Sequence, residues 1–224
     1  MTSADNSNEP AATKGAVPAK LGKPVETSRD TAGADYAERL RRLEGAWWKR
    51  VLNVQAPYRW NLRRLNLGRT LDVGCGIGRN LINLGPDSVG VDHNASSIEI
   101  ARSRGLRAFT VEQFLSSEYA KPGAFDSMLV AHVVEHMPDA DAREVVGMYL
   151  PYLKQGGRVL FITPQEKGYA SDHTHVRFCG FAEVGALARD LGLSVEKQYS
   201  FPLPRWTGKA FTYNEFNVLT RKGE

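Results

Sequence analysis

A glycine-rich turn is the first feature of this sequence whose residue types suit chemistry. In TLDVGCGIGRNL, a short apolar run ends at Asp72, and Gly74, Gly76 and Gly78 follow at alternate positions. Glycines let the backbone approach a ligand closely because no Cβ intervenes, and a helix that begins behind the turn points amide N–H groups at that ligand. The segment therefore predicts a cofactor-binding turn.

The spacing of these glycines excludes two classes of cofactor site. A phosphate-binding P-loop needs Gly, four residues and then Gly-Lys-Ser/Thr, and the sequence contains no such run. A nicotinamide fingerprint needs G-x-G-x-x-G, but the last position, counted from Gly74, is Arg79. The pattern that remains is an acid two residues before G-x-G-x-G.

The second feature is the segment HVVEH, in which His132, Glu135 and His136 stand at i, i+3 and i+4. A helical turn would carry all three on one face. Imidazole can serve as a general base, and imidazole and carboxylate can both bind metals. His132 and His136 are therefore the candidate catalytic bases, and the three residues together are the candidate metal ligands. The alternative is that Glu135 and His136 only cap and brace a loop.

These residues need a framework that brings them together. After Gly68, short apolar strands alternate with helical stretches, which predicts a mainly parallel sheet with helices on both faces. We expect strands at 70–73, 88–91, 108–111, 127–130 and 159–162, helices at 80–84, 95–104, 141–153 and 181–191, and a final antiparallel pair of strands at 193–200 and 213–220. In such a sheet, ligands bind at the carboxyl ends of the strands.

The amino-terminal part of the chain differs in composition from the rest. Residues 1–33 have almost no large apolar side chain, which predicts a disordered tail. Residues 34–68 carry apolar side chains at helical spacing and predict a helical lid, and residues 69–224 are expected to form the main domain.

Composition and charge narrow the function classes. The 224 residues are 42% hydrophobic and 24% charged, and the net charge of +4 is spread without the dense basic patch of a nucleic-acid-binding protein. The two cysteines cannot build a disulfide framework, and no apolar run is long enough to span a bilayer. The sequence thus predicts a cytoplasmic protein that acts on a small molecule, and it is compatible with a homodimer.

Taken together, the motifs resemble those of class I S-adenosylmethionine-dependent methyltransferases. After the glycine-rich turn, GVDHN ends the second strand with Asp92, TVEQFL falls where the family has an acidic loop beside adenine, and FDSMLVAHVVEHMPD and LKQGGRVLFITP resemble its fourth-strand and fifth-strand motifs. The resemblance implies an α/β fold with a Rossmann-like, doubly wound sheet, mostly parallel with an antiparallel edge strand. It also implies S-adenosylmethionine as cofactor and S-adenosylhomocysteine as product.

The resemblance also assigns roles to individual residues. It implies that Asp72 lies near the amino end of the cofactor, that Asp92 accepts the ribose hydroxyls, and that Glu112 binds the adenine amino group. The expected cofactor contacts are Asp72, Gly74, Cys75, Gly76, Gly78, Asp92, His93, Glu112, Gln113, Phe114 and Ala131, of which Gln113 and Phe114 flank the base.

Some quinone-biosynthesis O-methyltransferases resemble HVVEH closely, with Glu in place of His132. In those enzymes the triad holds a divalent cation such as Mg²⁺, but imidazole suits zinc or iron better. The string His-x-x-Glu-His also occurs in certain zinc proteases, and its place inside the methyltransferase motif set argues against a protease.

The acceptor is predicted from a further polar segment and from aromatic residues. In this fold, the loop that contains SDHTHVRF overlies the acceptor site, although its polarity also suits an ordinary surface loop. The candidate substrate contacts are Tyr36, Trp48, Tyr169, His173, His175, Arg177 and Trp206. Flat aromatic faces with histidine and arginine suit a ring-shaped hydroxyl compound.

We therefore expect a methyltransferase that acts on a hydroxyl of a small polar acceptor, with a sugar hydroxyl as the first candidate. A base, or a divalent cation, would deprotonate the hydroxyl as it attacks. Two alternatives remain open: an N- or C-methyltransferase that shares the same cofactor motifs, and a non-catalytic module that only binds the cofactor.

Overall fold

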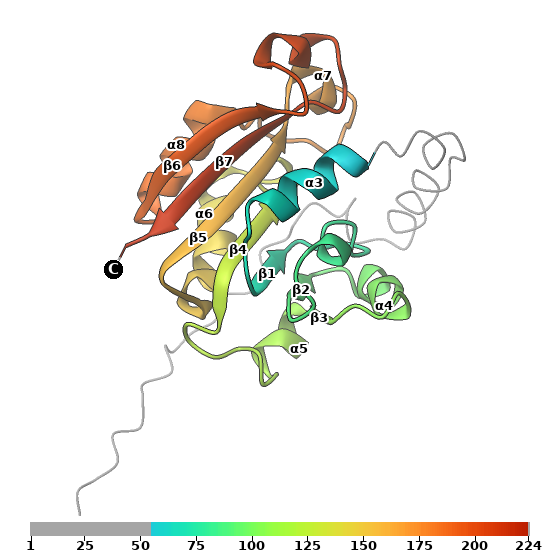
Figure 1. Ribbon diagram of the computed structural model, residues 1–224, viewed down its shortest axis with the longest axis vertical. Coiled ribbons are helices and arrows are strands. Elements are labelled where there is room, and N and C mark those ends of the chain that lie inside the picture. Colours follow the sequence, from blue (N-terminus) through green and yellow to red (C-terminus); the bar gives the residue numbers. More distant parts are fainter. Residues whose placement is uncertain (1–54, 224) are drawn as a thin grey trace, which may run out of the picture.

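Seven strands form one sheet, in the order β3-β2-β1-β4-β5-β7-β6, in this computed structural model, which describes residues 55–223 (Figure 1). The strands are β1 (Thr70–Val73), β2 (Val89–Asp92), β3 (Ala108–Thr110), β4 (Phe125–Ala131), β5 (Leu153–Pro164), β6 (Leu193–Phe201) and β7 (Glu215–Lys222). The first five strands pair in parallel. The sheet is therefore mostly parallel, as the alternation of strands and helices predicts.

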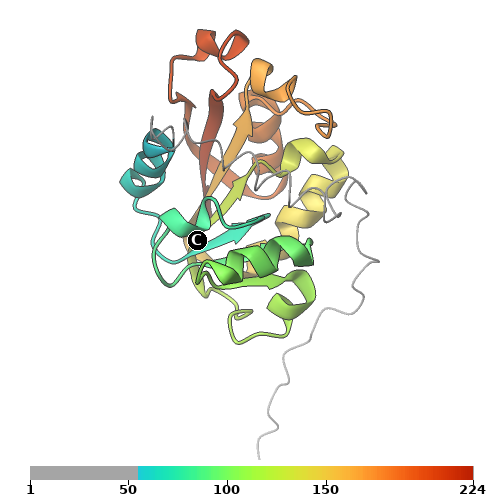
Figure 2. The same cartoon turned by 90° about the vertical axis from the view of Figure 1, so that its right-hand side faces the viewer.

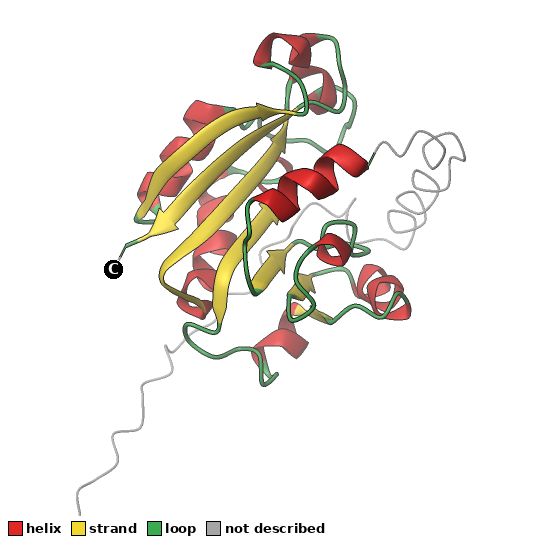
Figure 3. Ribbon diagram, in the orientation of Figure 1, coloured by secondary structure: helices red, strands yellow, loops and turns green. Residues whose placement is uncertain are grey.

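Helices cover both faces of this sheet (Figures 2 and 3). The α-helices are α3 (Ala56–Arg64), α4 (Ala95–Ser103), α5 (Val111–Leu115), α6 (Asp139–Tyr149), α7 (Glu166–Tyr169) and α8 (Phe181–Asp190). Short 3₁₀ segments are η2 (Leu81–Asn83), η3 (Val134–His136), η4 (Leu150–Tyr152) and η5 (Arg205–Lys209). Because both faces are covered, all residues of β1 and β2 are buried, which explains their nearly continuous apolar sequence.

The largest hydrophobic cluster lies between the sheet and α5, α6 and α8. It includes Phe114, Val146 and Leu187, each at most 1% exposed. On the other face, Leu62 of α3 packs in a second cluster, and Ile98 of α4 in a third. Packing in these clusters holds the strands in place. The candidate functional residues lie at the ends of these strands.

One detail of the fold differs from the sequence expectations. The helix expected at 80–84 is only the 3₁₀ segment η2, since Asn80 and Asn83 favour caps and turns over a helix interior. The expected antiparallel pair is confirmed at one edge of the sheet, where β7 lies between β5 and the edge strand β6 and runs antiparallel to both. In the sequence β6 comes before β7. The link 202–214 joins the two strands, and β7 lies beside β5.

The predicted domain boundaries can be compared with the structure only in part. The predicted tail 1–33 and residues 34–54 of the predicted lid lie outside the described residues. The part of the lid that is described is α3, which docks on the sheet through buried Leu62 and through a 2.8 Å hydrogen bond from Asn61 Nδ2 to Asn217 Oδ1. No helix within 55–223 is long and apolar enough to cross a membrane.

The strand order reverses between β1 and β4. The chain proceeds from β1 to β2 and β3 on one side, and then to β4 and β5 on the other. In open α/β sheets the crevice outside the carboxyl ends of the strands at this point holds the ligand. The glycine-rich turn follows β1 and the His132–His136 segment follows β4, so both chemical features meet at this crevice.

Candidate functional site

The glycine-rich turn requires its glycines. Gly74, Gly76 and Gly78 have φ of 72°, 51° and 84°, values that side-chain-bearing residues adopt only with strain. A Cβ on Gly74 would also lie 2.3 Å from Cγ2 of Val133, and one on Gly78 would lie 2.2 Å from Cδ1 of Leu106. The turn thus owes its shape to both conformation and packing, and it brings its backbone close to the end of β4.

Asp92 holds this turn against the end of β2. Its Oδ2 accepts a 2.8 Å hydrogen bond from the Gly76 amide, and its Oδ1 accepts one of 2.8 Å from the Asn94 amide. The Asp92 side chain is 9% exposed, and Nδ1 of His93 lies 3.4 Å from Oδ1. Each carboxylate oxygen can accept more than one hydrogen bond, so the predicted bonds to the ribose hydroxyls stay compatible with this geometry.

Asp72 has an unusual environment for a carboxylate. It is 1% exposed, and among the described residues its Oδ2 has no hydrogen-bond partner. Burial, together with the charge of Asp92, raises the pKa of Asp72 to about 8, although the backbone N–H of Leu81 acts in the opposite direction. An orphaned buried oxygen next to a glycine turn fits the ammonium group of an amino-acid-containing cofactor.

Cys75, in the same glycine-rich turn, is 7% exposed. Burial, reinforced by the charges of Asp72 and Asp92, raises the pKa of its thiol well above the ordinary value. A protonated, buried thiol is a small packing residue and not a nucleophile.

The TVEQFL segment forms α5, and this corrects one of the adenine predictions. Phe114 is 0% exposed and packs against Phe125, Tyr149 and Tyr152 in the core, so the prediction that it flanks the base is wrong. A single helical turn places its apolar side chain inward.

The two residues before Phe114 are on the outside of α5. Gln113 completes a capping box with Thr110 and also accepts a 2.7 Å hydrogen bond from Arg102. Glu112 is exposed, and its Oε2 accepts a 2.9 Å hydrogen bond from the Thr110 hydroxyl. The predicted contact of Glu112 with the adenine amino group therefore stays a prediction.

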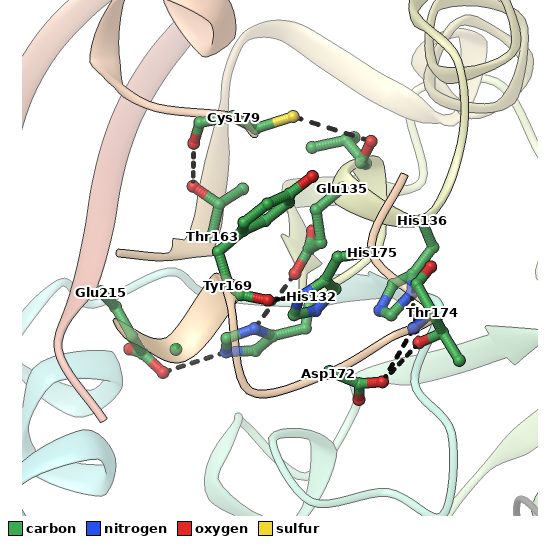
Figure 4. A network of polar contacts seen from close by, with 12 residues as sticks. His132, Glu135, His136, Thr163, Tyr169, Asp172, Thr174, His175, Cys179 and Glu215 are labelled. Carbon is green, nitrogen blue, oxygen red and sulfur yellow. Dashed lines mark hydrogen bonds and ion pairs between the residues drawn. The ribbon is translucent and has the colours of Figure 1, made fainter. Parts of the chain in front are cut away.

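His132 follows Ala131, the 7% exposed last residue of β4, and adopts the left-handed conformation with φ of 57°. Its Nδ1 lies 3.2 Å from Oε1 of Glu135 and its Nε2 lies 3.0 Å from Oε1 of Glu215 on β7 (Figure 4). Partial burial lowers the pKa of His132, but the hydrogen bonds to the two carboxylates outweigh this effect and raise the pKa to about 10. His132 is therefore an imidazolium that bridges two acids.

This geometry bears on two predictions for His132. Both ring nitrogens face carboxylate oxygens, so neither is open to a substrate or a metal ion in this structure. The assignments of His132 as catalytic base and as metal ligand are not confirmed and stay predictions. The assumed helical face does not form, because the left-handed residue at 132 and the short 3₁₀ turn of η3 direct its ring toward β7.

His136, at the end of η3, has the opposite character. Its Nδ1 lies 3.1 Å from the hydroxyl oxygen and 3.2 Å from the carbonyl oxygen of Thr174 (Figure 4). The Thr174 hydroxyl donates to Oδ1 of Asp172 at 2.8 Å, so towards His136 it acts as an acceptor. Nδ1 of His136 therefore carries the proton and Nε2 keeps a lone pair. Burial lowers the pKa of His136, which keeps the ring neutral.

His175 is in the same tautomeric state. Its Nδ1 lies 2.7 Å from the carbonyl oxygen of Tyr169, which can only accept, so Nδ1 donates and Nε2 is free. The ring stacks on Tyr169 with centroids 5.2 Å apart, and its centroid lies 4.8 Å from that of His136.

Glu135 lies close to the imidazole rings of His136 and His175. It is 0% exposed, and within the described part of the chain its Oε2 has no hydrogen-bond partner. One oxygen of Glu135 and one nitrogen each of His136 and His175 all lie within 4.8 Å of one another. The loop that carries His175 is held there because the Glu135 carbonyl accepts hydrogen bonds from the amides of Val176 and Arg177 at 2.8 and 3.1 Å.

The remaining substrate predictions divide into three groups. Tyr169 and His175 lie together at the site, whereas Tyr36 and Trp48 lie outside the described residues. His173 is 74% exposed and Trp206 is 76% exposed, so neither joins this cluster. Arg177 pairs with Asp139 of α6 at 2.8 Å.

Sequence reasoning missed Glu215 and Thr174, which set the charge of His132 and the tautomer of His136. Glu215 lies 83 positions from His132, and Thr174 lies 38 positions from His136. Neither position carries a local motif.

Comparisons with known proteins agree with this architecture. A family described as "Methyltransferase domain" matches residues 36–198. The ubiquinone biosynthesis O-methyltransferase of Chromobacterium violaceum is 26% identical over 196 residues, which are 71% of this chain and 82% of that protein. The enzyme of the same name from Pseudomonas paraeruginosa is 27% identical over 201 residues, which cover 74% and 86% of the two chains.

Solved structures share the fold at lower identity. Magnesium protoporphyrin IX methyltransferase from Synechocystis, with bound S-adenosylhomocysteine, superimposes with a TM-score of 0.60 at 15% identity and covers 87% of this chain and 98% of that chain. A possible histamine N-methyltransferase from Thermotoga maritima superimposes with a TM-score of 0.59 at 19% identity, covering 84% and 98%.

Proposed function

This chain belongs to the methyltransferase-domain family and is an S-adenosylmethionine-dependent methyltransferase, and on that premise we propose that it methylates a hydroxyl group of a small acceptor. The names of its relatives support oxygen as the methylated atom. The chemistry of the site at the end of β4 supports the same choice.

The observation that carries the proposal is the group of free lone pairs on Glu135, His136 and His175, which we call the acceptor cluster. Methyl transfer from a sulfonium to a hydroxyl requires that the hydroxyl lose its proton as the oxygen attacks, whereas an amine is already nucleophilic when neutral. Proton removal by a placed base contributes typically about 10²–10⁴ in rate. A site that presents three lone-pair atoms beside the cofactor crevice suits this demand.

The two parts of the site then have distinct roles. Asp72 and Asp92, with the glycine-rich turn, bind and orient the cofactor, and alignment of the methyl group with the attacking oxygen lowers the barrier by about 7–11 kcal/mol. His136 presents Nε2 because Thr174 and Asp172 fix its Nδ1–H. Tyr169, stacked on His175, adds an aromatic ring to the site, which suits a cyclic acceptor.

The sugar acceptor of the sequence analysis has no support in the names of these relatives. We propose instead that the acceptor is a ring compound with a free hydroxyl. Phenols and sugars are both compounds of this kind, and a direct comparison distinguishes them. The test is the release of S-adenosylhomocysteine with a panel of phenols, catechols, sugars, carboxylic acids and amines. Release with hydroxyl compounds supports the proposal, and release with carboxylic acids or amines alone contradicts it.

A further inference from the structure

We propose that Glu135, His136 and His175 together bind a divalent transition-metal ion, with His175 as the ligand that replaces His132. The site is the acceptor cluster of the proposed function, but the binding of a metal can be measured without methyl transfer. The ligand set differs from the one that the sequence motif indicates, because one ligand comes from the loop after β5.

The cluster contains an excess of unpaired acceptors. The three donor atoms lie within 4.8 Å of one another, and Glu135, which supplies one of them, is 0% exposed with Oε2 unpaired among the described residues. A buried carboxylate oxygen without a partner is costly. A cation between the three atoms would satisfy all of them at once.

The rings of His136 and His175 are also oriented as metal ligands are. Metal-binding histidines almost always donate the other ring N–H to a carbonyl, carboxylate or similar acceptor, which fixes the tautomer. His136 donates Nδ1–H to Thr174, which is itself held by Asp172, and His175 donates Nδ1–H to the Tyr169 carbonyl. Both rings are thus held with Nε2 available, as ligation requires.

His132, which is the ligand expected from the motif, is engaged elsewhere in this structure. Its two nitrogens are bonded to Glu135 and Glu215 at 3.2 and 3.0 Å. Coordination through either nitrogen would require His132 to leave one of these carboxylates. In this chain His132 instead contacts Oε1 of Glu135 and leaves Oε2 without a hydrogen-bond partner among the described residues.

The donor set also selects the metal. Two imidazole nitrogens and one carboxylate oxygen suit Zn²⁺, Fe²⁺ or Co²⁺, whereas Mg²⁺ prefers oxygen ligands. Bonds of about 2.0–2.2 Å to Zn²⁺ would draw the three side chains together by torsion. When bound, such an ion would occupy the Nε2 lone pair of His136, and its Lewis acidity, which lowers the pKa of a coordinated hydroxyl, would take the place of proton removal by that ring.

The test is a titration of the full chain, stripped with chelator and dialysed, with Zn²⁺ by calorimetry and with Co²⁺ by visible absorption. We expect one ion per chain and a Co²⁺ spectrum of a low-coordinate nitrogen–oxygen site. In H175A the Zn²⁺ affinity should fall by more than about 100-fold, since the loss of even an outer-sphere partner costs about 10–100-fold.

Two variants serve as controls. His173→Ala removes an exposed histidine from the same loop and should leave Zn²⁺ affinity unchanged. H132Q keeps a donor to Glu135 and should lose less than about tenfold, the low end of an outer-sphere change. S-adenosylhomocysteine affinity is measured in every variant and should stay constant, which verifies the fold.

The outcomes separate the proposals. Absence of stoichiometric Zn²⁺ binding in the wild type, or loss in H132Q with retention in H175A, overturns the metal site. Methylation of hydroxyls by a protein that binds no metal would support the proposed function and reject the metal site. Metal binding without hydroxyl methylation would support the metal site and reject the proposed function.

Discussion

The two parts of the site differ in how far apart their residues lie in the sequence. In the cofactor part, the Asp92 carboxylate binds an amide 16 positions away, at Gly76. In the acceptor cluster and its supports, His136 binds Thr174 across 38 positions, and His132 binds Glu215 across 83. The first part is therefore encoded by one local strand–turn–strand unit, and the second exists only after the whole sheet has assembled.

The two parts share one electrostatic feature. Each contains a buried carboxylate with an unpaired oxygen among the described residues, Oδ2 of Asp72 and Oε2 of Glu135. Asp72 responds to its environment by a raised pKa, whereas the adjacent His132 imidazolium lowers the pKa of Glu135 against the effect of burial. The protonated form of the carboxyl is therefore favoured in the cofactor part, and the charged form is favoured in the acceptor cluster.

The largest expected effect separates chemistry from cofactor binding. His136→Ala removes the lone pair that Thr174 orients, so turnover should fall by about 10²–10⁴-fold. The affinity for S-adenosylhomocysteine should stay within a factor of about two, because the other part of the site is intact. Steady-state kinetics and calorimetry measure the two quantities, with His173→Ala as control. Wild-type turnover in the variant would remove His136 from catalysis.

Removal of bound metal by a chelator is a second test of the acceptor cluster. EDTA treatment should reduce methyl transfer by at least about tenfold, which corresponds to 1.4 kcal/mol of lost transition-state stabilisation. Added Zn²⁺ should restore the rate, and cofactor affinity should not change. Full activity at saturating EDTA would reject metal assistance.

The cofactor part is tested by Asp92→Ala. The substitution removes the acceptor for the Gly76 and Asn94 amides and the predicted partner of the ribose. A charge-assisted hydrogen bond contributes about 1.5–3 kcal/mol, so S-adenosylhomocysteine affinity should fall by about tenfold or more. Calorimetry measures the affinity, and thermal unfolding verifies that the variant folds. Unchanged affinity would show that the ribose lies elsewhere.

The smallest effect concerns stability, and it depends on pH. The folded-state pKa of Asp72, about 8, lies above its ordinary value of 3.8, so the folded protein retains a proton that the unfolded chain has lost. Stability from this group is present below the unfolded pKa and disappears as the pH rises towards 8. Asp72→Asn, which keeps an acceptor but cannot ionise, should therefore be more stable than the wild type at pH 9.

The measurement is thermal unfolding of both proteins without cofactor at pH 5 and pH 9. For a chain of this size, about 1 kcal/mol shifts the Tm by about 2–4 °C. The difference in Tm between variant and wild type should increase by several degrees from pH 5 to pH 9. A difference that does not change with pH would place the ionisation of Asp72 outside this range.

The comparison also explains what the sequence alone could predict. The strand–helix alternation and the glycine-rich turn identify the fold and the cofactor, since apolar runs and glycine positions are local signals. Helical spacing predicts one shared face for His132 and His136, but the left-handed conformation of His132 interrupts any helix there. The misplacement of Phe114 has a similar origin: a one-turn helix has too few residues to reveal its buried face.

Contacts formed across the sheet could not be predicted in this way. Glu215 meets His132 only because β7 inserts between β5 and β6, with Glu215 paired to Pro164 at the carboxyl end of β5. His175 reaches His136 because hydrogen bonds to the Glu135 carbonyl hold its loop. Neither contact corresponds to a recognisable spacing of residues in the sequence.

The most direct test of the central claim is the identity of the methylated atom. The best hydroxyl acceptor from the panel is offered together with its amino analogue, in which an amine replaces the reacting hydroxyl, and the products are identified by mass spectrometry. The acceptor cluster predicts that the wild type forms the O-methyl product and that His136→Ala loses it. Methylation of the amine in preference to the hydroxyl, at a rate that His136→Ala does not change, would contradict the account.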